Sequence, residues 1–183
     1  MPESRLATPA DIPALRRLIE ASVRGLSAGY YTKAQVESAL RYVFGPDSQL
    51  IADRTYYVIT DERGELVAAG GWGRRRTLHG GDQMKAADDP LLDPATDAAR
   101  IRAFFVHPAW ARRGLARRLF ERCAADAFTA GFRSLELMAT LPGEPLYRAL
   151  GFEPRDRSAA ALPDGEVLAI VRMTRPLTDS PGG

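Results

Sequence analysis

The stretch from residue 101 to 131 constrains the fold most, because it passes from a strand through a short turn into a helix. Residues 101–106 are mostly apolar and aromatic, which predicts a buried strand. Pro108 ends this strand, since it pushes the preceding His107 out of helical geometry. The next apolar residues recur at every fourth position of a helix that closes at Gly131: Leu115, Leu119, Cys123 and Ala127. A buried strand that leads into an amphipathic helix indicates an α/β domain.

Caps, breakers and β-branched runs predict the other elements. Helices begin at Thr8, which precedes a proline, and at the capping box of Thr32, and the Gly45–Pro46 pair stops the second helix. Strands are expected over residues 5–7, 55–60, 65–72, 133–139, 152–157 and 167–174, with a short helix over 144–150. Helices and strands therefore follow the order β-α-α-β-β-β-α-β-α-β-β. Because they alternate only in part, we expect a mixed sheet rather than a doubly wound parallel one.

The chain has the length of one domain. Its 183 residues suffice to bury a substantial core, and we expect a single domain over residues 1–178 with a disordered tail over 179–183. The polar stretch from residue 74 to 99 shows no clear periodicity. Loops of this length are uncommon in compact domains and are usually functional or mobile.

Composition excludes several classes of protein. No stretch approaches the ~18 apolar residues of a membrane span, and the single cysteine, Cys123, rules out an internal disulfide. His79 and His107 lie far apart, without the spacing of a zinc site, so no metal is expected. The net charge of +2 is too mild to indicate nucleic-acid binding. These features are typical of a soluble cytoplasmic protein.

The turn between the central strand and its helix has the chemistry of a phosphate site. The first amides of a helix lack intrahelical partners and carry the positive end of the helix dipole. Gly114 and Ala116 are small enough for an anion to approach those amides, and Arg112, Arg113 and Arg117 add positive charge. The alternative is that small residues serve packing there and that the arginines form a solvated face.

Two spaced motifs resemble the GCN5-related N-acetyltransferase (GNAT) family. Residues 111–116, Ala-Arg-Arg-Gly-Leu-Ala, are similar to the family's acetyl-CoA signature, Arg/Gln-x-x-Gly-x-Gly/Ala, with Ala111 as a departure at the first position. Residues 147–152 resemble its Tyr-x-x-x-Gly-Phe motif. The order of elements from residue 5 to 174 also matches, so the resemblance covers nearly the whole chain.

The resemblance implies an enzyme that moves an acetyl group from acetyl-CoA, used as a co-substrate, to a primary amine by direct attack with both substrates bound. In the family the fourth and fifth strands splay apart around the pantetheine arm, and a free amide near Phe105 and Val106 would polarise the thioester. Tyr147 would protonate the departing thiolate, or alternatively only pack beneath the cofactor. The implied cofactor-binding residues are Phe105, Val106, Arg112, Arg113, Gly114, Leu115, Ala116 and Arg117.

The general base stays open. Many relatives carry a glutamate on the fourth strand, which this chain lacks. Glu136 on the next strand is the nearest carboxylate by element order, but a water chain or a structural role beside an arginine is equally compatible. Cys123 is expected to serve core packing rather than covalent catalysis, and His107 is expected to form hydrogen bonds at the strand end.

The resemblance implies that the acceptor pocket is lined by the connection between the first two helices, residues 26–31, and by the loop after the third strand. Tyr30, Tyr31 and Trp72 are expected to stack on an apolar or aromatic amine. The arginines at 74–76 would suit an anionic group or be only a solvated turn. Four aspartates of the same loop would attract a cation: Asp82, Asp88, Asp89 and Asp93. The acceptor, a small molecule, a peptide N-terminus or a protein lysine, therefore stays open.

Two other functions remain compatible with the sequence. The chain would serve as a non-catalytic acyl-CoA-binding regulatory module, or, as a toxin-like acetyltransferase, it would modify charged tRNA. Nucleic acid is the less favoured partner because the net charge is weak. Relatives frequently form homodimers, and no membrane partner is expected.

Overall fold

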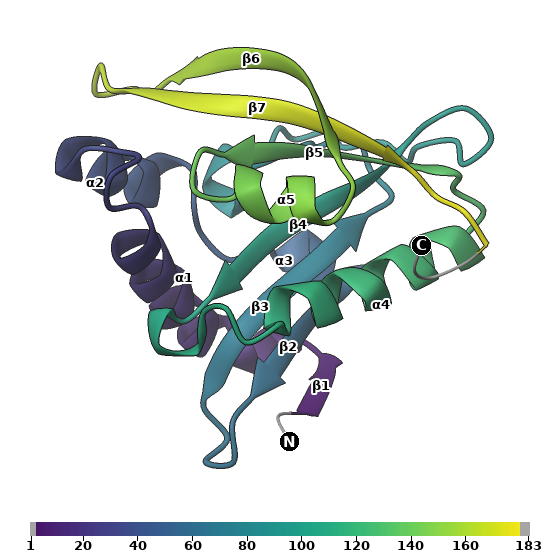
Figure 1. The fold of residues 1–183 in the computed structure, drawn as a ribbon, viewed down its shortest axis with the longest axis horizontal. Helices are drawn as coiled ribbons and strands as arrows, with labels where there is room; N and C mark the ends of the chain where they lie inside the picture. Colours follow the sequence, from purple (N-terminus) through teal and green to yellow (C-terminus); the bar gives the residue numbers. More distant parts are fainter. Residues whose placement is uncertain (1–2, 180–183) are drawn as a thin grey trace.

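The protein is built on one seven-stranded sheet (Figure 1). The computed structural model describes residues 3–179, so most of the expected disordered tail lies outside the described residues. In chain order the strands are β1 (Glu3–Leu6), β2 (Tyr56–Thr60), β3 (Leu66–Gly73), β4 (Ala99–Val106), β5 (Ser134–Thr140), β6 (Glu153–Ala161) and β7 (Val167–Pro176). Their order across the sheet is β1-β2-β3-β4-β5-β7-β6.

The sheet is mixed, as predicted. All pairs of neighbouring strands are antiparallel except β4 and β5, which run parallel. Those two strands pair only at their first residues, where Ala99 lies opposite Leu135 and Arg100 opposite Glu136. On its other side, β5 pairs with β7 along the whole length of β5. The sheet therefore opens between β4 and β5 toward their carboxyl ends.

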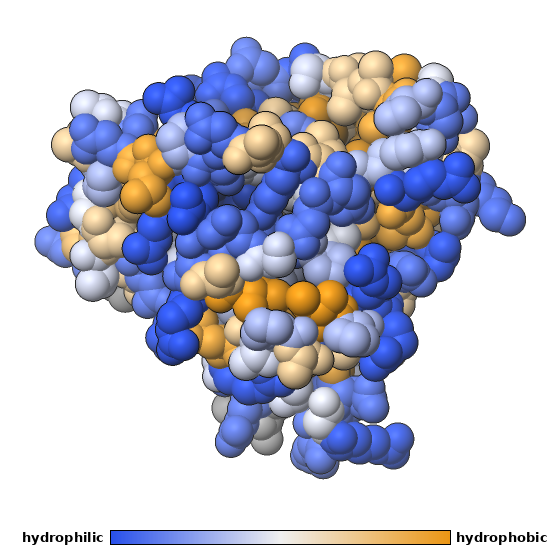
Figure 2. Space-filling view, turned by 180° about the vertical axis from the view of Figure 1, so that it is seen from behind, coloured by the Kyte–Doolittle hydropathy of each residue, from blue (hydrophilic) through white to orange (hydrophobic). Residues whose placement is uncertain are grey.

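Helices cover both faces of the sheet (Figure 1). They are α1 (Ile12–Leu26), α2 (Lys33–Tyr42), α3 (Ser48–Ala52), α4 (Leu115–Thr129) and α5 (Glu144–Ala149). The apolar face of α4 packs on β3 and β4, where Leu119 and Cys123 join the largest core cluster with Met173 of β7. Leu15 of α1 packs with Tyr56 in a second cluster. Seen from behind, the surface is mainly hydrophilic and is interrupted by a hydrophobic strip (Figure 2).

A bulge interrupts β4 at the place where it leaves β5. Two residues, Ala103 and Phe104, face the single Gly70 of β3 across this irregularity. Ala103 has a left-handed φ of 55°, and its carbonyl accepts a 3.0 Å hydrogen bond from the hydroxyl of Tyr56. A side chain at Gly70 would meet the ring of Phe104 at 2.9 Å. The bulge re-aims the end of β4 and helps to hold the sheet open.

The element order differs from the predicted one only by the addition of α3 and three short 3-10 turns: Pro9–Asp11, Asp82–Met84 and Pro108–Trp110. Asp47 caps α3 by accepting a 3.0 Å hydrogen bond from the amide of Leu50. A five-residue helix of this kind shows no full period of hydrophobicity, so periodicity alone misses it. The stretch from residue 74 to 99 is partly ordered by a bridge between Arg75 and Leu91 and by the turn at Asp82.

Candidate active site

A cavity of about 850 Å³ fills the opening between β4 and β5. Residues from β4 and β5 form its centre, and the start of α4 and the α5 segment close one end. The other end lies among α1, the connections before and after α2, and the loop after β3. Among the described residues, no aspartate or glutamate lines it. The described lining is therefore mostly apolar, and its charged side chains are basic.

The turn before α4 has the backbone geometry that an anion needs. Arg112 and Gly114 have left-handed φ angles of 61° and 79°, and a Cβ added at Gly114 would meet no atom within 4 Å. The 15-residue α4 begins directly afterwards, and its first amides lack intrahelical partners. Residues of the turn and of the start of α4 line the cavity: Arg112, Gly114, Leu115, Ala116 and Arg117.

The side chains of two expected cofactor-binding residues contact other parts of the protein. The guanidinium of Arg113 lies 4.8 Å above the ring of Trp110, and Arg113 is not among the residues that line the cavity. The side chain of Leu115 is buried in the main core cluster. Only the backbone of Leu115 is therefore suited to contact a ligand.

Phe105 and Val106 lie in the cavity wall where the two strands separate. The amide of Val106, however, donates a 3.2 Å hydrogen bond to Oγ of Ser22 on α1. It is therefore not the free donor expected at this place. Sequence reasoning missed Ser22 because the contact joins residues 84 positions apart.

Tyr147 lines the cavity from α5. Its ring contacts Phe104 and Phe152 edge-on, with centroid distances of 6.4 and 5.8 Å. Burial raises the pKa of the Tyr147 phenol, so the hydroxyl is protonated at neutral pH. The carbonyl of Leu150, just beyond α5, accepts a 2.6 Å hydrogen bond from Arg175 of β7.

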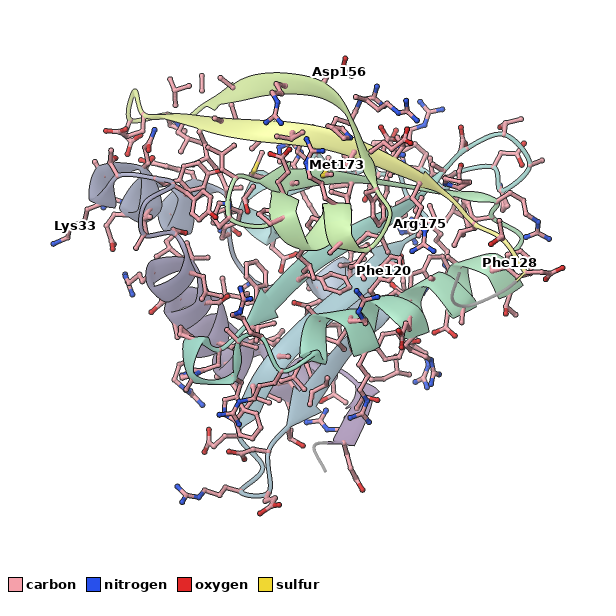
Figure 3. The ribbon with its side chains drawn as sticks, in the orientation of Figure 1. Lys33, Phe120, Phe128, Asp156, Met173 and Arg175 are labelled. Atoms are coloured by element: carbon pink, nitrogen blue, oxygen red, sulfur yellow. The ribbon has the colours of Figure 1, made fainter. Side chains whose placement is uncertain are left out.

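Arg175 also links β7 to α4. Its guanidinium lies 5.2 Å from the centroid of Phe120, and Figure 3 shows the two labelled side chains between β7 and α4. Phe120 in turn contacts Phe152 edge-on at 5.7 Å. The short α5, which has few residues of its own to stabilise it, is thus held in place by contacts from two longer elements.

The structure places the three residues expected in the acceptor pocket in three different environments. Tyr30 lines the cavity and is 49% exposed. Tyr31 also lines it, but its hydroxyl donates to the carbonyl of Ala169 at 2.6 Å and accepts from the amide of Leu141 at 2.9 Å. The prediction for Trp72 was wrong: the side chain is 3% exposed and packs edge-on against Phe132, outside the cavity. Its place on the core face of β3 removes it from the site.

The loop after β3 lines the cavity with residues that sequence reasoning did not single out. They are Leu78, His79, Gly80 and Gly81. The four aspartates expected to attract a cation lie outside the lining. Asp82 accepts from the amide of Ser48 at 3.0 Å and Asp89 from the amide of Thr77 at 2.8 Å. The sequence offered one signal for these residues, a histidine within a polar stretch that shows no periodicity.

The remaining candidates have structural partners. Glu136 forms ion pairs with Arg100 and Arg172, the latter at 2.8 Å. Nδ1 of His107 accepts a 3.2 Å hydrogen bond from the amide of Ala109. Cys123 is fully buried, and burial raises the pKa of its thiol, which leaves it unreactive.

Two classes of feature are absent from the described residues. Within residues 3–179, no group of three or more His, Cys, Asp or Glu residues is placed to hold a metal ion. In the same part of the chain, every helix is too short or too polar to cross a membrane.

Comparison with known proteins adds a family and a fold. Residues 21–152 match the family described as the acetyltransferase (GNAT) family. No curated protein is significantly similar to the chain.

Many solved structures share the fold. A GCN5-related N-acetyltransferase from Rhodopseudomonas palustris is 22% identical, with a TM-score of 0.71 and coverage of 97% of this chain and 96% of that one. A phosphinothricin acetyltransferase from Sinorhizobium meliloti, solved with acetyl-CoA, is 23% identical, with a TM-score of 0.63 and coverage of 96% and 88%. The putative acetyltransferase yncA from Salmonella typhimurium, also solved with acetyl-CoA, is 18% identical, with a TM-score of 0.62 and coverage of 100% and 98%.

Proposed function

The chain belongs to the GNAT family of acetyltransferases, and from this premise we propose that it transfers the acetyl group of acetyl-CoA to the primary amine of a small molecule or a peptide. The observation that carries the proposal is the continuous cavity between β4 and β5. It joins a turn suited to bind an anion at one end to a largely apolar chamber at the other, and Tyr147 lines it from α5.

The end of the cavity near α4 fits the pyrophosphate of acetyl-CoA. The open space at Gly114 and the absence of carboxylates from the lining favour a multiply charged anion. Arg112 and Arg117 supply positive charge at the same end. The departure at Ala111 is offset by Arg112, the neighbouring residue in the same turn. The two similar structures solved with acetyl-CoA support this proposal through their shared fold.

Tyr147 is suited to protonate the thiolate that leaves. Tyr147 lines the cavity, its phenol is protonated at neutral pH, and two aromatic rings fix its orientation. A proton donor held in place beside a leaving group contributes to catalysis. Holding both substrates in one cavity removes much of the entropic barrier to direct attack.

The far end of the cavity favours an acceptor with an apolar group beside its amine. Apolar and aromatic side chains predominate there: Val23, Leu26, Tyr30, Val43, Phe44 and Met138. Since no carboxylate lines this end, a polycationic acceptor would find no counter-charge. We therefore place amines with one positive charge and an apolar body ahead of polyamines and lysine-rich segments.

A thermal melt with acetyl-CoA tests the proposal, with free adenosine as the control. A ligand at 100 times its Kd stabilises the folded state by about 2.7 kcal/mol, which corresponds to a shift of several degrees. A shift with acetyl-CoA and none with adenosine is expected, followed by release of the CoA thiol when a suitable amine is added. The absence of a shift at millimolar acetyl-CoA would contradict the proposal.

A further inference from the structure

The acetyl transfer proposed above, on which this inference rests, needs a group that removes a proton from the acceptor amine. An alkyl ammonium resembling lysine has a pKa near 10.4, so most of it carries an extra proton at neutral pH. The carboxylate expected nearest to the reaction, Glu136, is held between Arg100 and Arg172 and does not line the cavity.

His79 is the one side chain of the described lining that can accept a proton near neutral pH. The other ionisable groups there are phenols and guanidinium groups: Tyr30, Tyr31, Tyr147, Arg102, Arg112 and Arg117. Both kinds of group keep their protons at neutral pH. An imidazole, in contrast, exchanges its proton in the range in which such enzymes operate.

The loop that carries His79 is fixed by Arg102 of β4. One nitrogen of this guanidinium donates to the carbonyl of Thr77 at 3.1 Å, and the other donates to the carbonyl of Gly80 at 2.6 Å. These two carbonyls flank the segment of Leu78 and His79. Arg102 is only 4% exposed, so solvent hardly competes for these bonds. The imidazole is therefore presented to the cavity by a braced backbone rather than by a free loop.

The same loop is tied to the wall opposite the anion-binding turn. The amide of Gly81 donates a 2.8 Å hydrogen bond to the carbonyl of Val43. The next residue, Phe44, contacts Phe105 edge-on at 6.1 Å. Phe105 lies at the point where β4 leaves β5, which is where the thioester is expected. His79 thus belongs to the acceptor side of this junction.

The charges around His79 favour its neutral form. Burial lowers the pKa of His79, and the positive charge of Arg102 lowers it further. The other charged groups near the brace, from the segment before α3 and from the loop after β3, are Asp47, Asp82, Lys85 and Asp89. Asp47 and Lys85 pair with each other and Asp47 also pairs with Arg102, so the aspartate's charge is neutralised locally.

We propose that His79 is the general base of the acetyl transfer. The imidazole of His79 takes the extra proton of the ammonium and passes it to solvent, which leaves a neutral amine. As the amine nitrogen forms its bond to the acetyl carbon, the carbon–sulfur bond breaks, its electron pair goes to the sulfur, and the proton of the Tyr147 phenol passes to that sulfur. The second proton lost by the nitrogen returns through solvent to the phenolate, which restores both groups.

The test compares His79→Gln with His107→Asn, which changes the other histidine of the chain. Asparagine preserves the cap that His107 provides, so this variant serves as a matched control. Each protein is assayed for CoA release with phenethylamine, tryptamine and trialanine, and separately with hydroxylamine. Hydroxylamine is largely unprotonated at neutral pH and therefore needs little help from a base. A thermal melt with acetyl-CoA checks that each variant folds and binds.

For the amine that the wild type acetylates best, His79→Gln is expected to lower kcat by about 100-fold or more. Its acetyl-CoA melt shift and its rate with hydroxylamine should stay within a few-fold of wild type, as should all rates of His107→Asn. Unchanged kcat with the amine would overturn the assignment. An equal loss with hydroxylamine would also overturn it, because it would indicate a structural role. A wild-type protein inactive toward every nucleophile would instead refute the proposed acetyl transfer, and this inference with it.

Two further readouts separate proton transfer from folding. In the wild type, kcat should fall as the pH is lowered, with an apparent pKa below the ordinary histidine value of about 6.5. This acid limb of the pH profile should be absent from His79→Gln. In His79→Ala, added imidazole should restore part of the lost rate. Retention of the acid limb together with no rescue by imidazole would exclude His79 as the base.

Discussion

The guanidinium of Arg102 on β4 donates a 2.8 Å hydrogen bond to Asp47, the cap of α3, across 55 positions of sequence. Both side chains are almost fully buried, with 4% and 0% exposed. Lys85 pairs with the second oxygen of Asp47. This cluster joins β4, the segment before α3 and the loop after β3, and therefore determines the shape of one end of the cavity.

Arg102→Met is expected to destabilise the protein strongly. It leaves Asp47 buried with only Lys85 and the amide of Leu50 as partners. Loss of one partner of a buried ion pair costs about 3–5 kcal/mol, and we expect the lower part of this range. Urea unfolding measures the change. Arg24→Met, which removes an exposed ion pair with Glu37, should leave the unfolding midpoint unchanged. A similar midpoint for both variants would contradict the importance of the buried pair.

Gly114→Glu is expected to abolish acetyl-CoA binding. It places bulk and negative charge in the open space before α4, where the phosphates are proposed to lie. Gly165→Glu, in the turn between β6 and β7, is a matched control: Gly165 also has a left-handed φ, 90°, and open space around its Cβ position. Both variants place a non-glycine residue at a left-handed φ, so backbone strain destabilises each of them by a similar amount, about 1–2 kcal/mol. Calorimetric titration should show normal affinity only for Gly165→Glu. Equal affinities would disprove the phosphate site.

Tyr147→Phe is expected to lower kcat by about 100-fold or more while the Kd for acetyl-CoA stays nearly constant. The change removes the proton donor but keeps the ring contacts with Phe104 and Phe152. Steady-state kinetics with the best acceptor measures the effect. Tyr57→Phe serves as the control, because that hydroxyl binds Asp126 on α4 and lies outside the cavity. An unchanged kcat in Tyr147→Phe would leave the tyrosine a packing role only.

Asp11→Asn is expected to destabilise the protein at neutral pH but not in strong acid. A hydrogen bond from Arg5 lowers the pKa of Asp11 to about 2. Because the folded-state pKa is depressed, the stabilisation is complete above the unfolded value of about 3.9 and disappears as the pH falls through about 2. Solvent screening of the half-exposed Arg5 limits it to about 1 kcal/mol. Urea unfolding from neutral pH downward should show the two proteins converge. A constant difference would contradict the linkage.

Much of the fold was predictable because its signals are local. The caps at Thr8 and Thr32 and the four-residue repeat of α4 depend on residues within a few positions of one another. The mixed sheet was predictable from the order of those elements. α3 was not, because a five-residue helix is too short for a periodic signal.

By itself the sequence determined two segments: β4 with the turn and helix α4 that follow it, and the segment that carries Tyr147. Each of them depends on backbone chemistry inside one short stretch. Only the tertiary structure decided that Trp72 lies in the core, that Ser22 binds the amide of Val106 and that Arg102 braces the loop of His79. The face to which a side chain points is fixed locally. What it meets there depends on contacts between distant segments, whose free energies are realised only when the whole core packs together.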